Sequence, residues 1–85
     1  MIELYHRMEC PYSAKVRNYI EDNGIEDQIH YHDIEKEEDA SMRLFELTDK
    51  KEVPCLVVEG KPILNSNRII LWLDSNLLHR HQEAG

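Results

Sequence analysis

The spacing of apolar residues along the chain alternates between a period typical of strands and a period typical of helices. Ile2 and Leu4 alternate with polar neighbours, whereas Val16 and Ile20 recur at helical spacing. In chain order, the pattern predicts a strand over residues 2–5, a helix over about 11–23, a strand over 28–34, a helix opened by 35–39, strands over 55–58 and 61–64, and a final helix from 66. The order is β-α-β-α-β-β-α, an α/β arrangement.

Three local features refine the second half of this prediction. The acidic residues 35–39 suit the start of a helix, because negative charge is favourable at the positive end of the helix dipole. Pro62 cannot donate a backbone hydrogen bond, so its strand is expected at a sheet edge. Ser66 is expected to cap the final helix with its hydroxyl group. The apolar stripe expected on the second helix consists of Ala40, Leu44 and Leu47.

Composition and charge limit the class of protein. With 85 residues, 41% of them hydrophobic and 32% charged, the chain is expected to form one domain over residues 1–85 with its own core. The formal net charge of −7 argues against nucleic acid as a partner, which requires a basic surface. No apolar run is long enough to span a bilayer, and the first residues do not resemble a secretory signal. We therefore expect no membrane association and a cytoplasmic location.

Residues 10–13, Cys-Pro-Tyr-Ser, carry the clearest chemical signal. Pro11 suits the first position of a helix, which places Cys10 at the N-cap beside free N–H groups and the positive end of the dipole. Both stabilise a thiolate, so the pKa of Cys10 is expected to lie below that of a free thiol. Arg7 and His6, just before it, are expected to add positive potential. These features predict a nucleophilic cysteine.

Other cysteine and histidine residues leave alternatives open. Cys10 could instead be a buried small apolar residue, although its position before a helix proline argues against this. Cys55 is interpreted as a buried structural thiol, with a second redox thiol as the alternative. Two histidine pairs stand close in the sequence, His30 with His32 and His79 with His81. Neither pair has a third ligand at a spacing typical of zinc, so no metal site is predicted.

Three segments, in the same order and at similar spacing, resemble a known family. Residues 5–13, Tyr-His-Arg-Met-Glu-Cys-Pro-Tyr-Ser, resemble the active-site segment of glutaredoxins. Residues 52–54, Glu-Val-Pro, resemble a segment shared by glutaredoxins and the N-terminal domains of glutathione S-transferases. Residues 64–66, Leu-Asn-Ser, resemble the corresponding segment of those transferase domains. The resemblance implies a thioredoxin-like fold of the glutaredoxin type, with a four-stranded mixed sheet flanked by helices.

The resemblance also implies roles for individual residues. Cys10 becomes the nucleophile, and Pro54 is implied to be a cis proline that faces it. Arg7 is implied to meet the glycine carboxylate of glutathione, and the Val53 backbone to pair with its cysteine. Ser66 is implied to capture the γ-glutamyl carboxylate, which a free helix start also favours physically. The implied glutathione-binding residues are Arg7, Tyr12, Val53, Pro54, Asn65 and Ser66.

Ser13 replaces the second cysteine of a dithiol motif, so an internal disulfide within the motif cannot form. The resemblance therefore implies a glutathione-dependent thiol–disulfide oxidoreductase of the monothiol type, with glutathione as co-substrate and glutathionylated or disulfide-containing substrates as partners. One alternative is an iron–sulfur cluster carrier that also binds glutathione. Pro11 and Tyr12 replace the glycine and phenylalanine of such carriers, which makes it less favoured. Another alternative is a non-catalytic glutathione-binding domain.

Overall fold

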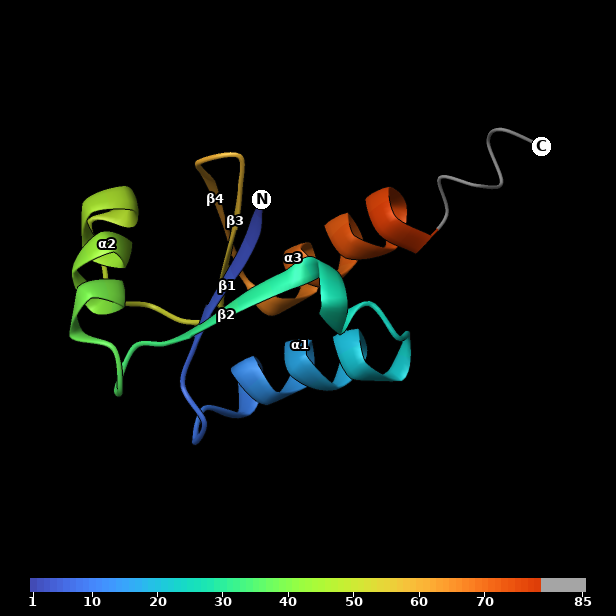
Figure 1. Cartoon of the computed structure of the whole chain (residues 1–85), viewed down its shortest axis with the longest axis horizontal. Helices are drawn as coiled ribbons and strands as arrows, with labels where there is room; N and C mark the ends of the chain where they lie inside the picture. Colours follow the sequence, from blue (N-terminus) through green and yellow to red (C-terminus); the bar gives the residue numbers. More distant parts are fainter. Residues whose placement is uncertain (79–85) are drawn as a thin grey trace.

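The computed structural model of the chain describes residues 1–78 (Figure 1). Its elements are β1 (Ile2–His6), α1 (Pro11–Asp22), the 3-10 turn η1 (Glu26–Gln28), β2 (Ile29–Asp33), α2 (Glu38–Thr48), β3 (Cys55–Val58), β4 (Lys61–Leu64), α3 (Ser66–Leu73) and the π-helical turn η2 (Asp74–Leu78). The predicted order of strands and helices is confirmed. Within residues 1–78, no helix has the length and apolar character that a bilayer-crossing segment requires.

The four strands form one mixed sheet in the order β2-β1-β3-β4. β1 pairs with β2 in parallel and with β3 in antiparallel orientation, and β3 pairs with β4 in antiparallel orientation. β4, which contains Pro62, is an edge strand, as expected for a residue without a backbone N–H. The predicted four-stranded mixed sheet is therefore confirmed.

Helices cover both faces of the sheet (Figure 1). On one face, α1 and α3 bury the larger apolar cluster, which includes Val16, Ile20, Ile69 and Leu73. On the other face, α2 contributes a smaller cluster. Its members are Tyr5, Ala40, Leu44, Cys55 and Val57. Alternate residues of β3 point to opposite faces, so this buried strand contributes to both clusters and is continuously apolar.

The second helix begins inside the acidic stretch 35–39, as expected, but only at Glu38, because Asp33 organises residues 35–37 as a turn. The Asp33 side chain accepts the Glu35 N–H at 2.9 Å, and its carbonyl accepts the Glu37 N–H at 2.9 Å. The expected stripe is also shorter, since Leu47 is 39% exposed while Ala40 and Leu44 are fully buried. Contact of this stripe with the buried core therefore ends one turn earlier than expected.

The register of the sheet brings three segments that are distant in the sequence to one end of the strands. Tyr5 pairs with Cys55, and Cys55 pairs with Leu64. The end of β1, the start of β3 and the end of β4 therefore lie side by side. The loop before α1, the residues before β3 and the start of α3 meet there. These are the three segments whose sequences resemble glutathione-binding segments.

Candidate functional site

Cys10 is the residue immediately before α1, as predicted. It has an extended backbone (φ −84°, ψ 119°), and Pro11 is the first helical residue. The Cys10 N–H donates to the Arg7 carbonyl at 3.3 Å, and the Cys10 carbonyl accepts the Ala14 N–H at 3.0 Å. Cys10 is 8% exposed, so little of the residue is accessible to solvent. This position combines limited solvent access with free N–H groups at the helix start.

The surroundings of Cys10 lower the pKa of its thiol. Burial acts in the opposite direction and raises the pKa, but the groups that favour the thiolate outweigh it. These groups are the backbone N–H and hydroxyl of Ser13, the backbone N–H of Tyr12 and the side chain of Arg7. The Cys10 Sγ lies 3.9 Å from the Val53 carbonyl oxygen. The predicted direction of the pKa shift is therefore confirmed.

Ser13 is part of this site although it lacks the chemistry of a second thiol. Its side chain is fully buried, and its Oγ accepts the Arg7 N–H at 3.3 Å. The same hydroxyl favours the Cys10 thiolate. Ser13 therefore connects the loop before α1 to the helix while it stabilises the charge on sulfur.

His6 does not supply the positive potential expected of it. It is the last residue of β1, it is 5% exposed, and burial together with the nearby Arg17 lowers its pKa. A histidine with a lowered pKa is neutral at neutral pH. Arg7, by contrast, is exposed and is one of the groups that favour the Cys10 thiolate. Of His6 and Arg7, only Arg7 therefore supplies the positive charge expected near the Cys10 sulfur.

Arg17 is a site residue that the sequence analysis missed. From the second turn of α1 its guanidinium donates to the Arg7 carbonyl at 3.1 Å and the Met8 carbonyl at 3.3 Å. It also lies 3.0 Å from the His6 Nδ1, which must accept because a guanidinium only donates. Arg17 thus holds the loop that leads to Cys10. Its position four residues after Ser13, on the same helix face, was the available signal.

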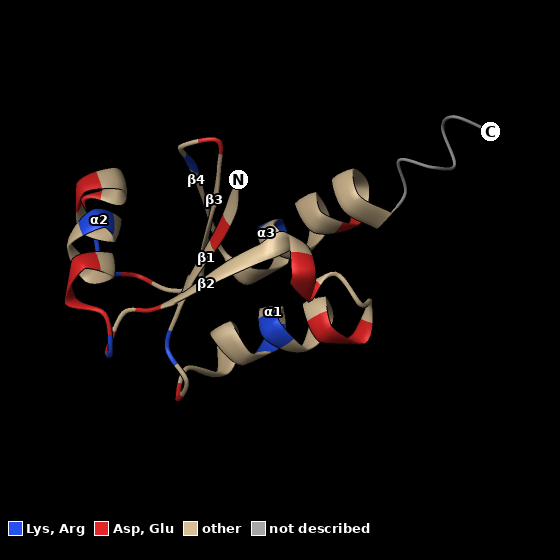
Figure 2. Ribbon diagram, viewed as in Figure 1, with Lys and Arg blue, Asp and Glu red and all other residues tan. Residues whose placement is uncertain are grey.

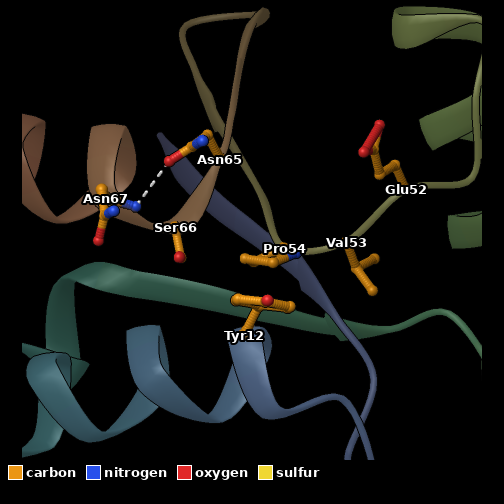
Figure 3. Close-up of a pocket in the computed structure, with 7 residues that line it drawn as sticks. All are labelled: Tyr12, Glu52, Val53, Pro54, Asn65, Ser66 and Asn67. Carbon is orange, nitrogen blue, oxygen red and sulfur yellow. Dashed lines mark hydrogen bonds between the residues drawn. The ribbon is translucent and has the colours of Figure 1, made fainter.

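A pocket of about 300 Å³ lies between the start of α1, the residues before β3 and the start of α3 (Figure 3). Cys10 is not among its lining residues, but the Cys10 Sγ lies 3.9 Å from the carbonyl oxygen of Val53, which lines it. Its lining residues are Tyr12, Glu52, Val53, Pro54, Asn65, Ser66 and Asn67. Five of the six residues implied to bind glutathione are therefore brought together, and Arg7 is not among the lining residues. Glu52 and Asn67 are added by the structure. Figure 3 shows the Ser66 hydroxyl directed into the space above the Tyr12 ring.

The Val53–Pro54 peptide bond is cis, as the resemblance implied. The start of α3 differs from its prediction, because Asn65 rather than Ser66 is the N-cap. The Asn65 Oδ1 accepts the N–H groups of Asn67 at 2.9 Å and Arg68 at 3.4 Å. Asn65 has a φ of 81°, a conformation that asparagine adopts more readily than most residues. Ser66 is consequently the first helical residue, with its side chain available to the pocket.

The two ends of the pocket differ in charge. At the start of α3, Lys15 Nζ donates to the Asn67 Oδ1 at 2.6 Å, and the helix contributes the positive end of its dipole. At the other end, Glu52 places a carboxylate beside Val53. Acidic residues also occupy α2 and the turn before it (Figure 2). The helix end of the pocket therefore has a cation at Asn67, and the other end has the Glu52 carboxylate with Lys50 Nζ 3.9 Å from it.

Cys55 lies on the opposite face of the sheet from α1. It is fully buried in the cluster beneath α2, and burial raises the pKa of its thiol to about 11. Both cysteines are free thiols. The burial and the raised pKa agree with the interpretation of Cys55 as a structural thiol. Its alternative, a second redox thiol, stays a prediction with no support in this geometry.

The histidine pairs do not assemble a metal site within the part of the chain that the structure describes. His32 instead lies between two carboxylates, with Nε2 3.0 Å from Glu3 and Nδ1 3.3 Å from Glu37. No group of three residues among positions 1–78 has an arrangement suited to a metal ion. His79 and His81 lie outside the described residues.

The comparisons with known proteins point to one family and one fold. The family described as glutathione S-transferase, N-terminal domain, matches residues 9–76. A search of curated proteins gave no match. A solved thioredoxin-like protein is 25% identical, with a TM-score of 0.65 over 76% of this chain and 86% of its own. The fold is thioredoxin-like, as the resemblance implied.

Two further structures share this fold at lower sequence identity. A glutathione transferase family member from Pseudomonas fluorescens Pf-5, solved with bound glutathione, is 21% identical with a TM-score of 0.75 over 88% of this chain. The chain spans only 38% of that transferase. The holo form of glutaredoxin C1 from Populus tremula x tremuloides is 20% identical, with a TM-score of 0.67 over 99% of this chain and 85% of its own.

Proposed function

The chain belongs to the family of glutathione S-transferase N-terminal domains, and from that premise we propose that it is a glutathione-dependent thiol–disulfide oxidoreductase that acts through Cys10. The observation that carries the proposal is the position of Cys10. Its thiol has a lowered pKa and lies within 3.9 Å of Val53, a residue that lines the pocket. A thiolate at the edge of a peptide-sized pocket is the arrangement that thiol exchange requires.

Glutathione is proposed to lie along the pocket with its cysteine beside Val53. An extended peptide can pair with exposed backbone groups, which brings its sulfur toward Cys10. The γ-glutamyl carboxylate is proposed to lie at the start of α3 near Ser66, where the helix dipole favours an anion. Arg7, on the loop before Cys10, is proposed to attract the glycine carboxylate. In this placement the thiol of the ligand reaches Cys10 between its two charged ends.

The proposed reaction consists of two thiol–disulfide exchanges. The Cys10 thiolate attacks the glutathione sulfur of a glutathionylated substrate, so a new disulfide forms and the substrate thiolate leaves and takes up a proton. The thiolate of a second glutathione then attacks this mixed disulfide, releases the Cys10 thiolate and forms oxidised glutathione. Glutathione supplies the two electrons. Because Ser13 carries no thiol, no disulfide within the motif competes with the second step.

This cycle requires a pool of reduced glutathione, so we propose that the protein works in the cytoplasm. The domain formed by residues 1–85 is proposed to carry the chemistry by itself. The cluster-carrier alternative stays a prediction, and anaerobic purification followed by visible absorbance spectroscopy tests it.

The proposal is tested by following reduction of a glutathionylated peptide with glutathione as the electron donor. We expect turnover in the wild type and in Cys55→Ala, and none above the uncatalysed rate in Cys10→Ser. Mass spectrometry of the wild type, stopped during turnover, should show a glutathione adduct on Cys10. Equal rates for the wild type and Cys10→Ser would refute the proposed activity.

A further inference from the structure

Among the described residues 1–78 that line the pocket, only Glu52 carries a formal charge. It precedes Val53 and lies at the end of the pocket away from α3 (Figure 3). Its carboxylate is also 3.9 Å from Lys50 Nζ, but the two side chains are 60% and 64% exposed. A pair this exposed is screened by solvent and leaves the carboxylate free to interact with a ligand. The proposed activity assigns Glu52 no role.

The opposite end of the pocket has the opposite polarity. At this end α3 begins with Ser66, which places the positive end of the helix dipole there, and the ammonium of Lys15 donates to Asn67. A carboxylate is therefore favoured at this end and disfavoured beside Glu52. Reduced glutathione carries a carboxylate at both ends, so its charge matches only one end of the pocket.

We propose that Glu52 makes this site selective for glutathione derivatives whose glycine carboxylate is masked, and above all for amides with an amine that brings positive charge to that end. The inference rests on the proposed function, which places the γ-glutamyl group near Ser66 and the cysteine beside Val53. In that placement the glycine end of the ligand extends past Val53 toward Glu52, the lining residue that precedes it in the chain. Two cations oppose this selectivity: Arg7, which is proposed to attract the glycine carboxylate, and Lys50, 3.9 Å from the Glu52 carboxylate. Neither lines the pocket, whereas Glu52 does.

The size of the effect follows from the electrostatics of an open pocket. Two like charges several ångströms apart in a medium close to water change an equilibrium by about threefold. Masking the glycine carboxylate removes this repulsion, and a cationic amide replaces it by attraction of similar size. We therefore expect KM to fall about threefold from glutathione to its C-terminal amide, and about tenfold from glutathione to a cationic polyamine amide. kcat should change little, because the charge lies away from the sulfur.

The experiment measures KM and kcat for glutathione, glutathione C-terminal amide and a glutathione–polyamine amide as electron donors. Glu52→Gln removes the carboxylate at nearly constant shape, and Glu46→Gln, an exposed change on α2, matches its change in net charge. We expect Glu52→Gln to bring the three KM values within a factor of two, and Glu46→Gln to keep the wild-type order. Raising the ionic strength should shrink the wild-type differences.

Two outcomes overturn the inference. A wild-type KM for glutathione equal to or below that for its amide would refute it, as would a Glu52→Gln variant that changes all three values by the same factor. These results leave the proposed oxidoreductase intact, provided that turnover depends on Cys10. If none of the three thiols gives a Cys10 adduct or Cys10-dependent turnover, both the proposed function and this inference are refuted.

Discussion

Replacement of Ser13 by alanine tests the origin of the low pKa of Cys10. The Ser13 hydroxyl has two roles in the site, since it favours the Cys10 thiolate and accepts the Arg7 N–H at 3.3 Å. Alanine removes both interactions and leaves the helix backbone in place. The backbone N–H groups of Ser13 and Tyr12 also favour the thiolate and survive the substitution. The change therefore isolates the contribution of the hydroxyl group.

The expected effect can be worked out from hydrogen-bond energies. A hydrogen bond to a charged group contributes about 1.5 kcal/mol at the lower end of its range, which corresponds to about a tenfold loss of thiolate at a pH below the pKa. A more basic thiolate is also a better nucleophile, and this recovers about threefold of the rate. We expect Cys10 in Ser13→Ala to react with iodoacetamide about threefold more slowly. The Arg7 N–H loses its acceptor, which costs about 1 kcal/mol of unfolding free energy.

The assay is the rate of iodoacetamide alkylation of Cys10 as a function of pH, with Ser41→Ala on α2 as the matched control. The midpoint of the profile should move to higher pH in Ser13→Ala and stay unchanged in the control. Urea denaturation separates the loss of stability from the change in acidity. A midpoint that moves no further than in Ser41→Ala would show that the backbone N–H groups and Arg7 alone account for the lowered pKa.

Three further predictions follow from the same geometry. Ser13→Cys should form an internal disulfide with Cys10 when oxidised, seen in mass spectrometry as the loss of two hydrogen atoms without a glutathione adduct; a persistent adduct would contradict the placement of position 13. Because Cys55 is fully buried with a raised pKa, native chains should be alkylated at Cys10 alone and unfolded chains at both thiols. The pKa of His6 is lowered in the folded chain, so the unfolded chain binds more protons. The free energy of unfolding should therefore fall as the pH drops through about 6.5. His6→Asn keeps an acceptor for Arg17 and should reduce this pH dependence, measured by urea denaturation at several pH values.

Much of the fold is predictable because its signals are local. Pro11 favours the first turn of a helix by its own geometry, and this alone places Cys10 at the N-cap. The apolar run of β3 and the position of Pro62 in an edge strand follow equally from short stretches of chain. Where two local signals compete, the prediction fails. Asn65 and Ser66 are both good caps, and the structure selects Asn65, which lies at the junction of β4 and α3.

Both the sequence and the tertiary structure were needed to define the candidate site. The sequence by itself predicted Cys10 as the nucleophile, determined that position 13 carries no thiol, and supplied the resemblance that named most of the pocket residues. Only the tertiary structure decided that Glu52 and Asn67 join the pocket, that Arg17 holds the loop before Cys10, and that His6 is buried and neutral. The physical reason is that helix starts are set by a few neighbouring residues, whereas a pocket and its charges arise from sheet register, which pairs residues tens of positions apart.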